Sequence, residues 1–246
     1  MCTVLLRFAP EEPLPLLMGA VRDEFTDRRW DPPARHWDGP AGHLIGGRDC
    51  TAGGTWLAVD PVRPAVAALL NGFRRPPPED GPRPTRGDLA LQLLTTGGLP
   101  GDLSRFDRFH LLLGTPDRVQ LWTWDGERLH HVDLAPGHHI VVNAGVDTDD
   151  DPLVPHFAPL LAPLPPDRSA WIQLLAGDGL DPTDDRALIV DRQIDGRPYA
   201  STSATLVRLA PDGVRYDFTA TPLDLASWYT VGDGGDGGQP IGDRPT

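Results

Sequence analysis

The sequence predicts an α+β fold, and three observations lead to that prediction. Strand-like runs dominate the chain, whereas helical patterns gather in its middle and late parts instead of alternating with the strands. The 246 residues are 39% hydrophobic and include 7 Trp and 7 Phe, which is enough for one core. No internal repeat or composition break separates a second core. We therefore expect a single domain over residues 1–230 and a disordered Gly/Asp-rich tail over residues 231–246.

The first third of the chain indicates four strands and long connections. A β-hairpin with a Pro-rich loop is expected first, a loop-rich stretch follows over residues 28–43, and a glycine-dense turn over residues 46–55 leads into the next strand. A buried run then ends in an Asn-Gly turn, before a polyproline-like surface loop over residues 74–85. The four expected strands are Cys2–Phe8, Leu16–Val21, Trp56–Val59 and Val66–Leu70.

The remainder of the chain mixes helices with a strand meander. Leucine spacing predicts a helix over Thr85–Thr96, with Thr85 as a possible cap. Three strand runs separated by Thr-Pro-Asp and Asp-Gly turns predict a meander over residues 108–134. A strand ending near Asn143, two short helices and a strand–turn–strand unit complete the chain. The helices are expected at Pro155–Leu161 and Ser169–Leu175, and the last unit covers residues 200–221.

Charge and cysteine content exclude several classes of protein. The net charge is −13, so the clustered cations that bind phosphate backbones or anionic membranes are absent, and we expect no nucleic-acid partner. Two cysteines do not form a disulfide framework in a chain of this length, which favours a reduced, cytoplasmic setting. The amino-terminal stretch lacks the pattern of a signal peptide, and no run of about 18 apolar residues predicts membrane insertion.

Cys2 is the first candidate functional residue. Methionine before a small residue is commonly removed, which would place a thiol and a free α-amine on one residue. An α-amine with a pKa of about 7.7–8.0 can act as a base near neutral pH, so nucleophile and base would be combined. The alternative is an ordinary cysteine packed at the start of a strand.

Charged and polar residues at strand ends are the next candidates. Arg22, Asp23 and Glu24 end the strand expected to pair with that of Cys2, and an arginine there would stabilise a thiolate. Because Arg22 and Asp23 face opposite sides of a strand, both reach Cys2 only if the strand breaks. The alternative for all three is a solvated charge run.

Asparagine is scarce in this chain, and both examples end predicted strands. Asn71 and Asn143 are therefore candidate oxyanion donors, although Asn71 also fits an ordinary Asn-Gly turn. The glycine-rich turn before Trp56 is sufficient as a tight turn, but it can also shape a pocket wall. The pairs His130–His131 and His138–His139 lack metal-ligand spacing, so we expect no metal site.

Taken together, these segments resemble the NRDE family, named for an Asn-Arg-Asp-Glu motif and including the transport and Golgi organisation protein 2 relatives. The resemblance runs from Cys2 to about Tyr229. It is carried by "MCTVLLRF", "VRDEFTDR", "GGTWLAV", "ALLNGFRRP", "TRGDL", "VVNAG" and "YASTSATLVRL". It implies an N-terminal-nucleophile hydrolase-like fold, a four-layer αββα sandwich of two antiparallel sheets.

The resemblance also implies site residues. Cys2 would be the nucleophile and its amine the base, with Arg22 and Asp23 in support and oxyanion donors at Asn71 and Asn143. Trp56, Glu24 and Thr202 are expected to contact the substrate. The sequence departs from the family pattern at two points. Val21 replaces the motif's asparagine, and residues 201–204 read Ser-Thr-Ser-Ala where relatives carry Thr-Arg-Thr-Asn or similar.

Three functions follow as hypotheses. The first is a cysteine amidohydrolase that acts on a small non-peptide or cyclic amide and needs no cofactor. The second is a carrier that binds haem or another hydrophobic ligand in the same cleft, with Cys2 or a histidine as an iron ligand. The third is an inactive family member. All three leave the oligomeric state open, and the first two take a small molecule as partner.

Overall fold

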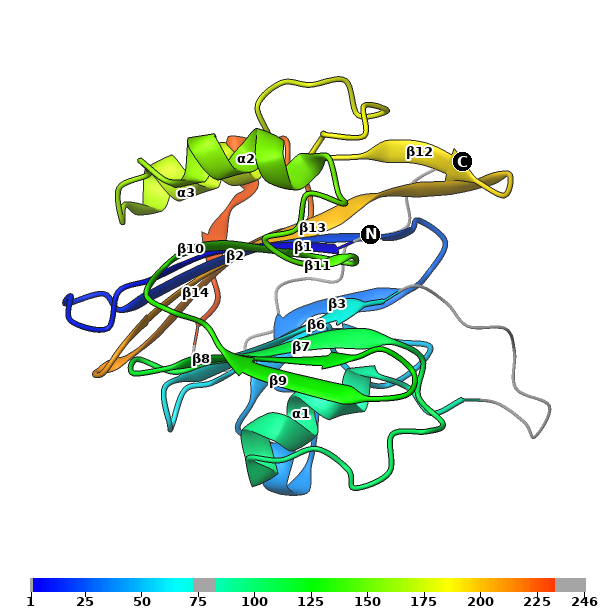
Figure 1. The fold of residues 1–246 in the computed structure, drawn as a ribbon, viewed down its shortest axis with the longest axis vertical. Helices are drawn as coiled ribbons and strands as arrows, with labels where there is room; N and C mark the ends of the chain where they lie inside the picture. The colour runs from blue at the N-terminus through cyan, green and yellow to red at the C-terminus, as the bar shows by residue number, and fades with distance from the viewer. Residues whose placement is uncertain (1, 73–82, 233–246) are drawn as a thin grey trace.

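The computed structural model describes residues 2–72 and 83–232, which form four layers in the order helix, sheet, sheet, helix (Figure 1). All strand pairs in both sheets are antiparallel within the described residues. The predicted α+β class and the αββα sandwich are confirmed. The polyproline-like loop predicted over residues 74–85 lies outside the described residues up to position 82. The predicted tail does so from position 233.

The first sheet combines the two ends of the described chain. Its main path runs β11-β10-β1-β2-β13-β14-β15, and β12 adds to β13. The predicted hairpin is confirmed, although its second strand continues past Val21 to Phe25. The strands are β1 Cys2–Phe8, β2 Leu16–Phe25, β10 Gly137–Val142, β11 Gly145–Val146, β12 Asp191–Ile194, β13 Arg197–Ala210, β14 Gly213–Thr219 and β15 Tyr229–Thr230.

The second sheet follows the order of the sequence, β3-β4-β5-β6-β7-β8-β9. The predicted meander over residues 108–134 forms its last three strands. The strands are β3 Trp30–Ala34, β4 Ile45–Asp49, β5 Leu57–Asp60, β6 Ala65–Asn71, β7 Phe109–Gly114, β8 Val119–Trp124 and β9 Leu129–Asp133. This sheet is therefore inserted between two parts of the first sheet, whose strands precede and follow it in the chain.

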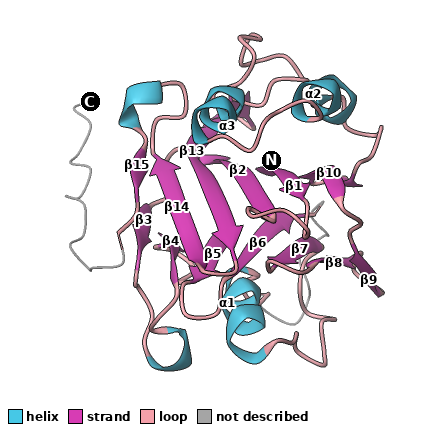
Figure 2. Ribbon diagram, turned by 90° about the vertical axis from the view of Figure 1, so that its left-hand side faces the viewer, coloured by secondary structure: helices cyan, strands magenta, loops and turns pink. Residues whose placement is uncertain are grey.

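Helices cover the two outer faces (Figure 2). α2 (Leu153–Leu161) and α3 (Arg168–Leu175) pack on the first sheet, and α1 (Gly87–Thr96) packs on the second. All three predicted helices are confirmed, within two residues at their starts. The short 3-10 turns η1 (Gly39–Ala41) and η2 (Leu225–Ser227) lie in connections. Each of the three interfaces between layers holds its own apolar cluster.

Five strands were not predicted from the sequence, and two of them, β11 and β15, are only two residues long. β3 contains two prolines, which a sheet tolerates because β3 lies at the edge and its register shifts between Asp31 and Ala34. β4 contains Gly46 and Gly47, which we interpreted as part of a turn. A Cβ on Gly47 would lie 2.3 Å from the Trp56 ring, so this glycine lets the ring lie against the strand. β12 is a short polar strand with no apolar alternation.

Candidate active site

The candidate residues gather at one end of the sandwich, where β1 begins. Cys2 is the direct neighbour of Arg22 on β2, and Arg22 is the direct neighbour of Ser203 on β13. β13 is bulged at Thr202, so that Ser201 pairs with Asp23 while Ser203 pairs with Arg22. The bulge places three consecutive hydroxyl residues next to Arg22 and Asp23 of β2.

The Cys2 thiol lies against the neighbouring strand, with Sγ 4.0 Å from the carbonyl oxygen of Asp23. Burial raises the pKa of this thiol above its usual range, and the nearby Arg22 guanidinium acts in the opposite direction. The thiol is therefore protonated near neutral pH in this arrangement. A base is needed to turn it into a nucleophile.

The Arg22 side chain is buried and is contacted by residues of three strands or loops. Its side chain is 5% exposed, its Nη1 donates to Thr202 Oγ1 at 2.9 Å, and its guanidinium lies 4.5 Å from the centre of the Trp56 ring. Glu24 pairs with Nη2 at 3.7 Å. Trp56, Glu24 and Thr202, predicted to contact substrate, therefore contact Arg22. We infer that they fix the direction of its positive charge toward Cys2.

Asp23 lies on the opposite face of β2 from Arg22. Both side chains could reach Cys2 only if the strand broke at this point. It does not break, because β2 continues to Phe25. The Asp23 carboxylate accepts a hydrogen bond from Ser201 Oγ at 2.6 Å, and its carbonyl accepts one from the Tyr199 hydroxyl at 3.0 Å. Burial raises the pKa of Asp23 to about 7, so it can change protonation near neutral pH.

Asn143 joins the two sheets next to Cys2. Its Oδ1 accepts a hydrogen bond from the Cys2 backbone nitrogen at 2.9 Å, and its Nδ2 donates to the carbonyl oxygen of Asn71 at the end of β6. The two asparagines are thus brought together, as the prediction of a common site requires. One hydrogen of the Asn143 amide points at the Asn71 carbonyl, and the second N–H of the same amide remains as a donor for an oxyanion.

His110, which we did not predict, completes the link from the second sheet. It lies on β7, is 6% exposed, and places Nε2 3.1 Å from the Asn143 carbonyl oxygen. Its Nδ1 lies 2.9 Å from Thr123 Oγ1 on β8. Burial lowers the pKa of this ring, so it is neutral near pH 7. The signal in the sequence was a single polar residue within the apolar run "RFHLLLG".

Trp30, Ser201 and Tyr199 were also not predicted. Trp30 meets Trp56 edge to face at 5.8 Å between ring centres, which extends the aromatic wall beside Arg22. Ser201 and Tyr199 contact Asp23, and they come from the strand in which we singled out only Thr202. Their roles depend on the bulge, which no pattern in the sequence indicates.

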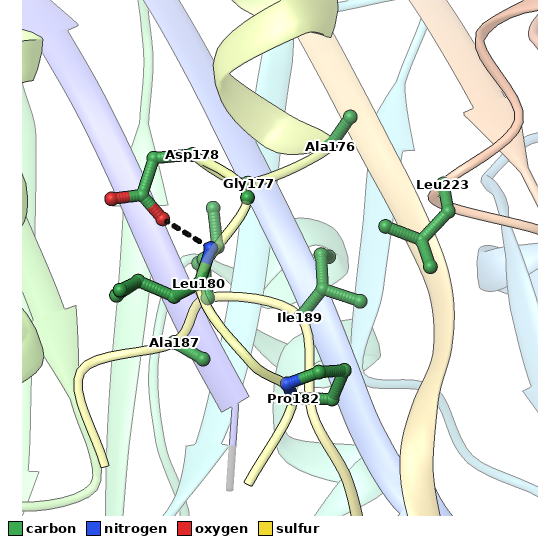
Figure 3. A pocket seen from close by; sticks show the side chains of 10 residues that line it. Ala176, Gly177, Asp178, Leu180, Pro182, Ala187, Ile189 and Leu223 are labelled. Atoms are coloured by element: carbon green, nitrogen blue, oxygen red, sulfur yellow. Dashed lines mark hydrogen bonds between the residues drawn. The ribbon is translucent and has the colours of Figure 1, made fainter. Parts of the chain in front are cut away.

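A separate hollow lies on the outer face of the first sheet (Figure 3). It is a shallow hollow, formed by the segment after α3 together with Leu223. None of the candidate site residues lines it. Ile189 forms part of its wall, and the next residue, Val190, donates its backbone N–H to Ser201 Oγ at 2.9 Å. Ser201 therefore links the segment that forms the hollow to Asp23.

Two features are absent from the described residues. No group of three or more His, Cys, Asp or Glu side chains in residues 2–72 and 83–232 is arranged to hold a metal ion. Within the same ranges, no helix has the length and apolar character needed to cross a membrane.

Comparisons with known proteins agree with this architecture. A family model described as "Transport and Golgi organisation 2" matches residues 1–156. Among solved structures, an N-acylethanolamine-hydrolyzing acid amidase ortholog from Caenorhabditis elegans is similar, with a TM-score of 0.53 and 8% sequence identity. The alignment covers 86% of this chain and 93% of that one, and it supports the fold. A comparison with curated proteins gave no match.

Proposed function

This chain belongs to the Transport and Golgi organisation 2 family, and on that premise we propose that it is an N-terminal-nucleophile cysteine amidohydrolase. Its substrate would be a small non-peptide or cyclic amide. The observation that carries the proposal is the arrangement at Cys2: a buried cation lies beside the thiol, and the side chain of Asn143 holds the Cys2 nitrogen. A cysteine that serves only as core packing requires neither contact.

The mechanism begins with removal of Met1, which would convert the Cys2 nitrogen into an α-amine. The amine takes the thiol proton, and the sulfur attacks the amide carbonyl carbon. An S–C bond forms while the C=O electron pair moves onto oxygen. The C–N bond then breaks as the oxygen re-forms the carbonyl, and the amine of Cys2 returns the proton to the leaving nitrogen. Water hydrolyses the thioester and restores the thiol.

The surrounding side chains have separate roles in this proposal. Arg22 stabilises the negative charge that develops near sulfur and oxygen. Asn143 orients the amine through Oδ1. An amide or backbone donor near Asn71 and Asn143 serves the oxyanion, a contribution of about 2.7–4 kcal/mol for one such donor in other acyl-transfer enzymes. Asp23 supplies a carboxylate whose charge changes near neutral pH.

The first test measures Cys2 directly. Intact-mass spectrometry of the full chain should show loss of Met1 and covalent addition of a β-lactam or acyl-coumarin amide. Cys2→Ala should abolish both the adduct and the release of the coumarin. Cys50→Ser is the matched control because Cys50 is exposed and lies outside the site, so the adduct should persist. A purified protein that retains Met1, or an adduct that persists in Cys2→Ala, would contradict the proposal.

The same variants distinguish the carrier hypothesis from the amidohydrolase hypothesis. A haem carrier should produce a Soret shift with micromolar haemin, and it should do so without turning over any amide. Cys2→Ala would remove the shift only if the sulfur is the iron ligand. An inactive family member would give neither amide turnover nor a Soret shift. These outcomes distinguish the three hypotheses on a single set of purified proteins.

A further inference from the structure

His110 lies next to the candidate site and, among the hydrogen bonds of residues 2–72 and 83–232, is joined to it through Asn143. Asn143 has three hydrogen-bonded attachments: the Cys2 nitrogen and the Asn71 carbonyl on its side chain, and the His110 ring on its backbone carbonyl. Two of these attachments come from the second sheet. The second sheet therefore helps to hold the Asn143 side chain next to Cys2, through hydrogen bonds that cross the interface between the two sheets.

The partners of His110 define which nitrogen carries its proton. A backbone carbonyl can only accept, so the Nε2 that faces Asn143 must be the protonated nitrogen. In a neutral ring Nδ1 is then an acceptor, and the Thr123 hydroxyl must be its donor. The chain of donors thus runs from Thr123 through His110 to Asn143. In this chain each hydrogen-bond donor faces an acceptor, and both ring nitrogens of His110 are hydrogen-bonded.

We propose that His110 is a positioning residue for the proposed reaction, and that Thr123 keeps its ring in the tautomer that holds Asn143. The inference rests on the proposed function, since it concerns the same nucleophile. Displacing Asn143 by a fraction of an ångström would misalign the Cys2 amine that takes the thiol proton. Small misplacements of this kind cost about 10–100-fold in rate when they disturb a catalytic geometry.

The test compares three variants in a Cys50→Ser background. His110→Leu removes the donor to Asn143, and His110→Gln returns an N–H donor at a similar distance from the backbone. Thr123→Val removes the hydroxyl that selects the tautomer. We expect His110→Leu to lower kcat about 10–100-fold with KM changed less than about threefold. His110→Gln should recover at least about tenfold of a hundredfold loss, and Thr123→Val should fall between Gln and Leu.

Two measurements separate a positioning role from a folding role. Rates are expressed per Cys2 titrated by the covalent probe, so that unfolded protein does not count. His131→Leu is the matched control: His131 lies on β9 in the same sheet, stacks on Trp122, and is hydrogen-bonded to Gln120, which is not a residue of the candidate site. It should leave kcat unchanged. A His110→Leu enzyme with the wild-type kcat per titrated Cys2 would overturn the inference.

Alkylation of Cys2 by iodoacetamide makes the inference independent of the substrate. His110→Leu should slow alkylation at pH 7.5 about tenfold, because proton transfer from the thiol needs the aligned amine. If the wild-type protein cleaves no amide, the proposed function fails, and the alkylation rates alone decide the role of His110. Equal rates in wild type and His110→Leu would then reject it, and a slower rate in the variant would support it.

Discussion

Single residues explain why this chain departs from the NRDE pattern. Val21 is 2% exposed and belongs to the apolar cluster between the first sheet and α2 and α3, where an asparagine would need a buried partner. Thr202 accepts a hydrogen bond from Arg22, which is itself buried. An arginine at position 202 would bring a second cation to that guanidinium. Both departures therefore fit their surroundings, and Arg22 is left as the cation next to Cys2.

The raised pKa of Asp23 should make the free energy of unfolding depend on pH. Its folded pKa of about 7 is raised above the unfolded value of about 3.9, so the folded state binds more protons between these limits. Its contribution to the free energy of unfolding should fall as pH rises from 4 to 7, by at most about 1.4 kcal/mol per pH unit, and level off above 7. Asp23→Asn should lack this dependence. Urea unfolding of both proteins at pH 5, 6, 7 and 8 measures the difference.

The matched control is Asp150→Asn, at an exposed position in a surface turn. Its unfolding free energy should follow the wild-type curve at every pH. Parallel curves for wild type and Asp23→Asn would show that Asp23 does not titrate differently in the folded state. The prediction would then be wrong, because a group whose pKa is the same in the folded and unfolded states makes the free energy of unfolding no more dependent on pH.

The sequence was informative about residues next to Cys2 in the sheet, and less so about residues that approach from other elements. Arg22 and Asp23 could be identified because they end the strand that pairs with β1. His110 and Ser201 could not, since their contacts depend on how the two sheets stack and on the β13 bulge. Long-range contacts of this kind leave no local pattern.

At the scale of elements, the docking of α1 depends on a close approach of two backbones. Gly54 precedes β5 and lies against Gly87, the first residue of α1, and the Thr55 N–H donates to the Gly87 carbonyl at 3.2 Å. A Cβ on Gly54 would lie 2.5 Å from the carbonyl carbon of Gly87. Backbone atoms cannot move aside as a flexible side chain can. The glycine-rich turn therefore has a structural role of its own.

Gly54→Ala should destabilise the protein by about 1–3 kcal/mol, the usual cost of overpacking. Gly98→Ala is the control, since its added Cβ has no atom within 4 Å and its backbone is not left-handed. It should be neutral or stabilising by less than about 1 kcal/mol. Urea midpoints of the two variants measure both values. A neutral Gly54→Ala would mean that α1 shifts freely on the sheet.

Some elements of the fold could be predicted from the sequence, and others could not. Helices and meander strands were placed correctly because their apolar spacing is regular. β3, β4 and β12 were missed because prolines, glycines and polar residues mask a strand whose only requirement is a paired backbone. Edge positions and close approaches permit such residues, and both are properties of the assembled sheet.

For the whole molecule, the cluster between the sheets predicts a single unfolding transition. Leu6, Phe8 and Met18 of the first sheet share it with Leu57, Val66 and Leu112 of the second. Neither sheet can unfold or separate without exposing the buried face of the other sheet to water. Far-UV circular dichroism and tryptophan fluorescence should therefore give coincident urea curves. Two separate transitions would mean that one sheet keeps its structure alone.

The order of strands along the chain also has a consequence for protein synthesis. The ribosome makes Cys2 and Arg22 early, whereas Asn143 and Thr202 emerge about 120–200 residues later. At about 5–20 residues per second, roughly 6–40 s pass before these later partners can pack next to Cys2. In the proposed function, removal of Met1 by an aminopeptidase would take place during that time, before Asn143 binds the Cys2 nitrogen. Completion of the first sheet would then enclose a residue whose processing had already taken place.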